Sequence, residues 1–377
     1  MICNVLLLGI TGVGKSALIN YLAGEEIAQS GISSRAGGIT HGINRYSIKI
    51  NNQACNVFDS EGLEVSHADY WKKMISNELL KSSATDNLSK WYHIVVYCIG
   101  ANSGRIQPFE LEIIKKLIND GYGVIIAFTK ADVVTNEELE ALQNTIASYF
   151  SDNSQLTYIP VCSVKTRNNI LEGKELLADA IWNAWGQSLL YRLPNYVYPE
   201  SLFREIVDFR NELVDYVNEY KIGFFGKSID DLITELNKFI EEGIEYWNDT
   251  ISDKQQKAEN DMKSIYQMLG KISNLKSLKI KNKNLQCHHL SIDKSLSNHS
   301  TARKVTKTAA LGAAMLINPI IGIPLAFAAI LKSRRKDNQS KEQITAAITE
   351  QANKLLSFYS KQKQKFRERL LDYANHS

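Results

Sequence analysis

The sequence predicts an α/β fold, with a doubly wound and mostly parallel sheet, followed by an all-α domain that carries a hydrophobic hairpin. In the first half of the chain, apolar runs near residues 2–8, 43–50, 54–59, 92–99, 123–129 and 156–161 alternate with segments of helical periodicity. Beyond residue 195, strand signals are few and apolar residues recur at helical spacing. We therefore expect a sheet covered by helices on both faces, and then a separate helical domain.

The composition is that of a cytoplasmic protein with more than one domain. A chain of 377 residues is too long for one compact core, and its five cysteines show no disulfide spacing. The first apolar strand begins almost at once, which leaves no room for a signal peptide. A net charge of +3 is too small to indicate nucleic acid as a partner.

Residues 9–16 read Gly-Ile-Thr-Gly-Val-Gly-Lys-Ser, which is a complete phosphate-binding loop between an apolar strand and a helix. Its glycines let backbone N–H groups turn toward phosphates, Lys15 supplies a cation, and the Ser16 hydroxyl is suited to bind Mg²⁺. The expected phosphate-binding residues are Gly9, Thr11, Gly12, Val13, Gly14, Lys15, Ser16 and Ala17. We expect Lys15 and Ser16 to serve catalysis as well.

A second apolar strand ends in Asp59-Ser-Glu-Gly62, a D-x-x-G pattern. The Asp59 carboxylate can hold a magnesium-bound water, and the Gly62 N–H can reach a terminal phosphate. Between this pattern and the phosphate loop lies the polar, glycine-rich stretch 33–41. There we expect Thr40 to be a second hydroxyl ligand of Mg²⁺ and Arg35 to help complete the catalytic site. The alternative roles are the start of a strand for Thr40 and a solvated loop cation for Arg35.

Two later strands are followed by segments that indicate which nucleotide base the site binds. Thr129-Lys130-Ala-Asp132 follows the first, and Ser163-Val164-Lys165 follows the second. They resemble the guanine-reading [NT]-K-x-D motif and the last nucleotide motif of GTPases. Asp132 would accept hydrogen bonds from guanine N1–H and the exocyclic amine, which adenine cannot offer. We therefore expect a GTPase that binds GTP and GDP with Mg²⁺ as its cofactor.

The order of these motifs resembles the Era, septin and dynamin side of the GTPase superclass, over about residues 1–185. One position departs from Ras-like enzymes, since Leu63 stands where they place a water-orienting glutamine. The resemblance implies slow intrinsic hydrolysis that depends on a partner or on self-association. A homodimer of the G domain is the expected form of that association.

The second half of the chain reads as helical. Apolar stripes are expected over 202–220 and 229–247, with Ser228 as an N-cap, and 344–370 continues the helical spacing. Residues 191–199, with two prolines, read as an ordered linker. The expected domains are a G domain at 1–188, a helical domain at 189–300, a hydrophobic hairpin with basic flanks at 301–336, and a returning helix at 337–377.

Residues 309–331 carry no charge and are long enough to span a membrane, but Pro319 and Pro324 interrupt them. Lysines and arginines flank both ends, which favours a hairpin that enters one leaflet of an anionic membrane. A hairpin buried in the helical domain and a single kinked span are the alternatives.

The whole layout resembles bacterial dynamin-like and immunity-related membrane GTPases, although beyond residue 195 only the architecture is similar. The resemblance implies a peripheral protein at the inner face of a membrane. The alternative is a soluble GTPase switch whose helical domain binds an unidentified protein or RNA partner.

Overall fold

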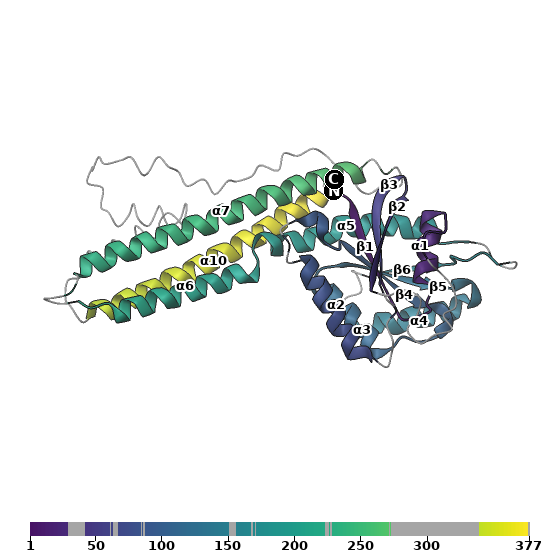
Figure 1. Cartoon of the computed structure of the whole chain (residues 1–377), viewed down its shortest axis with the longest axis horizontal. Helices are drawn as coiled ribbons and strands as arrows, with labels where there is room; N and C mark the ends of the chain where they lie inside the picture. The colour runs from purple at the N-terminus through teal and green to yellow at the C-terminus, as the bar shows by residue number, and fades with distance from the viewer. Residues whose placement is uncertain are drawn as a thin grey trace. The chain divides into compact units, whose positions relative to one another are not determined.

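The computed structural model describes two compact units (Figure 1). The first comprises Met1–Arg192, Asp261–Asn282 and Tyr373–Ser377, and the second comprises Leu193–Asn260 and Lys283–Asp372. The residues described are 1–28, 42–60, 62, 67–83, 85, 87–150, 156–166, 169, 171–222, 226, 228–270, 272 and 339–375. The predicted hairpin at 301–336 lies outside these ranges, so it stays a prediction. Within them, no helix combines the length and apolar character needed to cross a membrane.

The first unit is built on a six-stranded sheet in the order β2-β3-β1-β4-β5-β6. Its strands are β1 Cys3–Leu8, β2 Ile43–Ile50, β3 Gln53–Ser60, β4 Ile94–Gly100, β5 Gly123–Thr129 and β6 Leu156–Val161. β1 lies between β3 and β4 and is parallel to both, with Leu7 opposite Asp59. Only the edge strand β2 is antiparallel, because it joins β3 by a tight turn in which Asn51 and Asn52 have positive φ. The predicted mostly parallel sheet is confirmed.

Both faces of the central strands are buried, as their continuous apolar runs require. Leu6, Tyr97 and Phe128 belong to the core on one face, which α2 Ala68–Ser83, α3 Pro108–Asn119 and α4 Asn136–Ser148 also line. Side chains alternate along a strand, so the neighbouring residues point to the other face. Leu18 of α1 Lys15–Ala23 and Ile181 of α5 Lys174–Val197 are among the fully buried apolar residues outside the first core.

Capping residues fix where several helices begin. Thr135 accepts a hydrogen bond from Glu138 N and the Glu138 carboxylate accepts one from Thr135 N, which caps α4 at both groups. In the second unit, Ser228 Oγ accepts from Asp231 N at 3.1 Å and starts α7 Ile229–Leu269, as the sequence predicted. Short 3₁₀ turns occupy η2 Leu88–Lys90, η3 Ala101–Ser103 and η4 Ala131–Val133.

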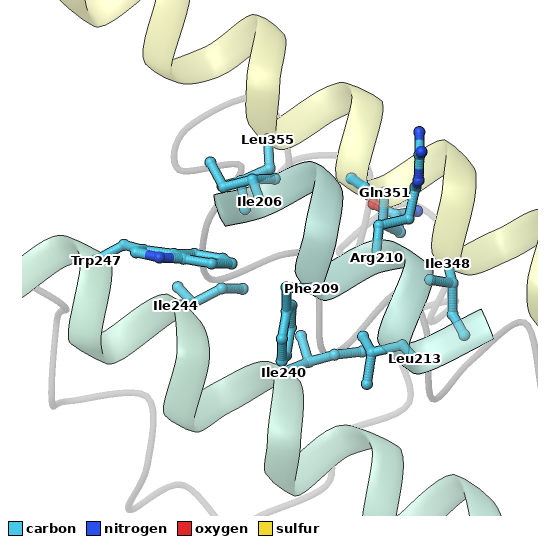
Figure 2. A pocket seen from close by; sticks show the side chains of 11 residues that line it. Ile206, Phe209, Arg210, Leu213, Ile240, Ile244, Trp247, Ile348, Gln351 and Leu355 are labelled. Atoms are coloured by element: carbon cyan, nitrogen blue, oxygen red, sulfur yellow. The ribbon is translucent and has the colours of Figure 1, made fainter. Parts of the chain in front are cut away.

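The second unit contains α6 Glu200–Glu219 and most of α7 and of α10 Gln339–Asn375, which lie side by side (Figure 1). Between them is a cavity of about 40 Å³, walled almost entirely by apolar side chains (Figure 2). Trp247 and Phe209 meet edge to face in this wall, with ring centroids 5.4 Å apart. Gln351 also lines the cavity, and its buried amide makes no hydrogen bond within the described residues. A site of this size and character accepts at most a water or two, so it is not a nucleotide site.

The expected linker at 191–199 was wrong, because α5 extends to Val197 and contains Pro194. The missing N–H of Pro194 costs one helical bond. Burial of Leu193, Val197 and Tyr198, each at most 1% exposed, offsets that cost.

A buried polar cluster around His93 and Arg192 lies at the start of β4. His93 is fully buried, its Nδ1 accepts from Asn4 N at 2.9 Å, and its Nε2 lies 3.0 Å from Leu88 O. The guanidinium of Arg192 lies over the rings of Trp91 and Tyr122, with 4.5 and 4.0 Å between its central carbon and the ring centroids. Burial, reinforced by the charge of Arg192, lowers the pKa of His93 to about 3.

Acid should therefore destabilise the first unit through His93. In the unfolded chain this histidine has a pKa of about 6.5 and binds a proton, whereas in the folded protein it stays neutral. The free energy of unfolding therefore falls as pH drops below about 6.5. Between pH 7 and pH 5 the loss should be about 2 kcal/mol. A His93→Gln variant should have a flatter pH dependence in urea unfolding. Equal slopes for the two proteins would contradict the assignment.

Candidate functional site

The phosphate loop adopts a backbone that only its glycines permit. Gly9, Gly12 and Gly14 have φ of 142°, 80° and 103°, a range that side chains with a Cβ rarely adopt. Gly14 directly precedes the first residue of α1, so the loop ends at a helix N-terminus. A helix N-terminus carries unpaired N–H groups and a partial positive charge, which suit an anion. Thr11, Gly12, Ser16 and Ala17 are partly or fully exposed at this end, and Val13 is buried.

Lys15 is buried beside the loop, with only 7% of its surface exposed. Its Nζ donates to Gly9 O at 3.0 Å and to Ile10 O at 3.4 Å. Burial lowers the pKa of this ammonium, while the Asp59 carboxylate acts in the opposite direction. The cation is therefore held by carbonyl dipoles and one carboxylate, and an added anion would favour its charged form further.

Ser16 meets Asp59 at the end of β3. The Ser16 hydroxyl donates to Asp59 Oδ2 at 2.8 Å, and Asp59 is fully buried. One hydroxyl and one carboxylate thus converge next to the phosphate loop. Hard oxygen ligands of this kind fit Mg²⁺, which usually takes few protein ligands and completes its shell with water and phosphate.

Gly62, from the D-x-x-G pattern, lies against the loop. A Cβ placed on Gly62 would come within 2.6 Å of Thr11 Cα, so only glycine fits at this approach. Thr40 and Arg35 lie outside the described residues, and their roles stay predictions. Residues 27 and 28, the last described before this gap, are hydrogen-bonded to α1. Asn20 Oδ1 accepts from Ile27 N and Ala28 N at 2.9 and 2.8 Å.

The base-reading segment is joined directly to the phosphate loop. Lys130 Nζ donates to Gly12 O at 2.9 Å, and the buried hydroxyl of Thr129 donates to Val13 O. Lys130 has a φ of 55°, which turns the chain from β5 into η4 and leaves Asp132 exposed. Two loops more than a hundred residues apart in the chain therefore form one site.

The structure adds Asn169, which sequence reasoning missed. Its Nδ2 donates to Asp132 Oδ2 at 2.9 Å, and this bond is the main cause that lowers the pKa of Asp132. No motif marks Asn169, since the S-x-K pattern stops four residues earlier. Ser163 is half-buried, and Val164 and Lys165 are exposed on the same loop.

The site thus brings together residues from the carboxyl ends of β1, β3 and β5 and the loop after β6. The phosphate-binding residues lie next to Asp59 and Gly62, and Lys130 links them to the segment that carries Asp132. In an open parallel sheet, ligands bind at this end of the strands.

Comparison with known proteins agrees with this arrangement. Residues 4–130 match the model of the family described as 50S ribosome-binding GTPase. GTPase Der of Rickettsia africae is 28% identical over 198 residues, which are 49% of this chain and 40% of that protein. GTPase Der of Rickettsia canadensis is 31% identical over 167 residues, or 43% of this chain and 34% of that one. The chain thus spans less than half the length of these curated relatives.

Among solved structures, Toc33 from Arabidopsis thaliana is similar, with 15% identity, a TM-score of 0.37, and coverage of 48% of this chain and 84% of that one. The match over residues 4–130 and the curated relatives show that this part of the chain is similar to the G domains of P-loop GTPases.

Lys15→Ala should abolish binding of guanine nucleotides, with at least a 100-fold loss of GDP affinity, because it removes a buried cation from the phosphate loop. Calorimetric titration with GDP measures this directly. Lys49→Ala, at an exposed lysine on β2, is the matched control and should bind as the wild type does. Normal GDP affinity in Lys15→Ala would refute the phosphate-loop assignment.

Proposed function

We propose that this protein binds GTP and hydrolyses it to GDP and phosphate. The observation that carries the proposal is the bond between Lys130 and Gly12 O, because it joins the base-reading and phosphate-binding segments in one site. This bond fixes the base-reading segment next to the phosphate loop, so a single nucleotide could contact both segments. An ATP-driven reaction is disfavoured by Asp132, which adenine cannot satisfy.

Each part of the site has a role that follows from its chemistry. The loop N–H groups and the Lys15 ammonium would neutralise charge that develops on the phosphates. Ser16 and Asp59, with Thr40 as the predicted third group, would hold Mg²⁺ directly or through water. Bound Mg²⁺ would act as a Lewis acid on phosphate oxygens. Nucleotide binding would thus depend on side chains and N–H groups that the fold already positions around the end of β1.

Intrinsic hydrolysis should be slow. Leu63 cannot orient the attacking water, so another group must do so, and Arg35 is the candidate within the chain. We propose that a G-domain homodimer, or a partner, completes the site. This proposal rests on the sequence at positions 35 and 63, both outside the described residues.

For the rest of the chain, our first proposal is a dynamin-like role at the inner face of an anionic membrane. Its support is the uncharged segment 309–331 with lysines and arginines on both flanks. GTP-dependent self-association would then occur at a lipid surface, where peripheral binding concentrates the protein.

The second proposal is a soluble switch whose helical domain binds a protein or RNA partner. The description of the matched family, 50S ribosome-binding GTPase, favours it. In this case hydrolysis resets a complex with the large ribosomal subunit, and 309–331 is buried within the protein.

GTP turnover separates these proposals. The purified chain should be assayed over a range of protein concentrations, alone, with anionic phosphatidylserine liposomes, and with 50S subunits. A dynamin-like protein should turn over faster per molecule as concentration rises and when liposomes are added, and deletion of 309–331 should remove only the lipid effect. Stimulation by 50S subunits alone would favour the soluble switch, and no turnover under any condition would refute the proposed enzyme.

Asp132→Asn should exchange base preference. The amide presents an N–H donor where guanine also donates, so GDP affinity should fall about 100-fold or more, while xanthosine diphosphate, which has a carbonyl there, should bind. Competition between the two diphosphates for the variant measures the change. Retained guanine selectivity would remove Asp132 from the base site.

A further inference from the structure

The loop after β6 is organised around one side chain, that of Asn169. Its Nδ2 lies within bonding distance of three acceptors, Asp132 Oδ2 at 2.9 Å, Val164 O at 2.9 Å and Cys162 Sγ at 3.2 Å. Its Oδ1 accepts from Thr166 N at 2.7 Å. Its backbone carbonyl accepts from Lys165 Nζ at 2.7 Å. One half-buried residue therefore contacts Cys162, Val164, Lys165 and Thr166 of the loop, and the carboxylate on the neighbouring segment.

These contacts determine how the Asn169 amide is oriented. Thr166 N can only donate, so the amide oxygen must face it, and the NH₂ group must then face Asp132. An NH₂ group has two hydrogens, and the two oxygens at 2.9 Å are better acceptors than sulfur. The bond to Asp132 is charge-assisted, which makes it the stronger of the two.

Asn169 makes the largest contribution to lowering the pKa of Asp132, ahead of the Cys162 thiol and the backbone N–H of Asp132 itself. Asp132 lies in the short turn η4, and its side chain is exposed. An exposed carboxylate rotates between several positions, and a ligand that needs one of them must supply the cost of fixing it. Each carboxylate oxygen has two lone pairs, so Oδ2 can accept from Asn169 and still accept from a base.

We propose that Asn169 is a positioning residue for base recognition, which holds the Asp132 carboxylate in the orientation that accepts the two donors of guanine. The inference rests on the proposed function, since it assumes that a guanine nucleotide occupies this site. The lowered pKa of Asp132 agrees with it, because a bound N–H donor favours the carboxylate. Recognition then depends on a residue outside the motifs that predicted the site.

The test compares GDP with inosine diphosphate, which lacks the exocyclic amine but carries the same phosphates. Calorimetric titration of the full chain gives both affinities for the wild type, Asn169→Asp and Asn169→Ala. Asn169→Ala removes the donor to Asp132 without adding a charge, whereas Asn169→Asp keeps an oxygen that can accept from Thr166 N but places a like charge beside Asp132. Asn144→Ala, at an exposed asparagine on α4, is the matched control.

We expect Asn169→Asp and Asn169→Ala to bind GDP about tenfold more weakly than the wild type, with the ratio of GDP to inosine diphosphate affinity falling toward one. Asn144→Ala should keep both values. An unchanged ratio in Asn169→Asp and Asn169→Ala, with equal losses for both diphosphates, would reduce Asn169 to a structural role and overturn the inference, while the proposed function would stand. A wild type that binds neither diphosphate would overturn both.

Discussion

The parallel pairing of β1 with β3 on one side and β4 on the other is the constraint on which the candidate site depends. It brings the loop that follows β1 next to Asp59 at the end of β3, and Leu7 lies opposite Asp59 in the register. A shift of one residue would move Asp59 to the other face of the sheet, away from Ser16 and Lys15. The Ser16–Asp59 bond and the electrostatic effect of Asp59 on Lys15 are therefore consequences of strand register as much as of side-chain chemistry.

The sheet was predictable because its strands are short apolar runs bounded by polar turns, and its motifs because phosphate and base contacts require particular residue types at fixed spacing. The continuation of α5 through Pro194 was not, because its stability comes from burial of side chains such as Val197, which no local pattern reveals. The role of Asn169 could not be predicted from the sequence for a related reason. Its importance lies in the neighbours that the fold gives it, and an isolated asparagine in a loop carries no spacing that would indicate them.

The two halves of the nucleotide site differ in how they are stabilised. Lys15 and Asp59 are buried, Lys15 donates to the backbone of the loop and Asp59 accepts from Ser16, so their positions are set when the sheet forms. Asp132, by contrast, is exposed, and its strongest restraint is the bond from the Asn169 side chain. Affinity for phosphate and discrimination between bases therefore rest on separate parts of the protein, and a substitution can alter one while preserving the other.

The tryptophans are divided unequally between the two units. Trp71, Trp91, Trp182 and Trp185 belong to the first unit, whereas Trp247 is the single tryptophan within the sequence ranges of the second. Trp247 forms part of the cavity wall between α6, α7 and α10, where it is 5% exposed. Replacing the other four indoles would leave a chain whose tryptophan fluorescence, excited where tyrosine does not absorb, comes from this cavity alone. Its emission wavelength would then report whether water enters the helical unit during the nucleotide cycle, without any attached dye.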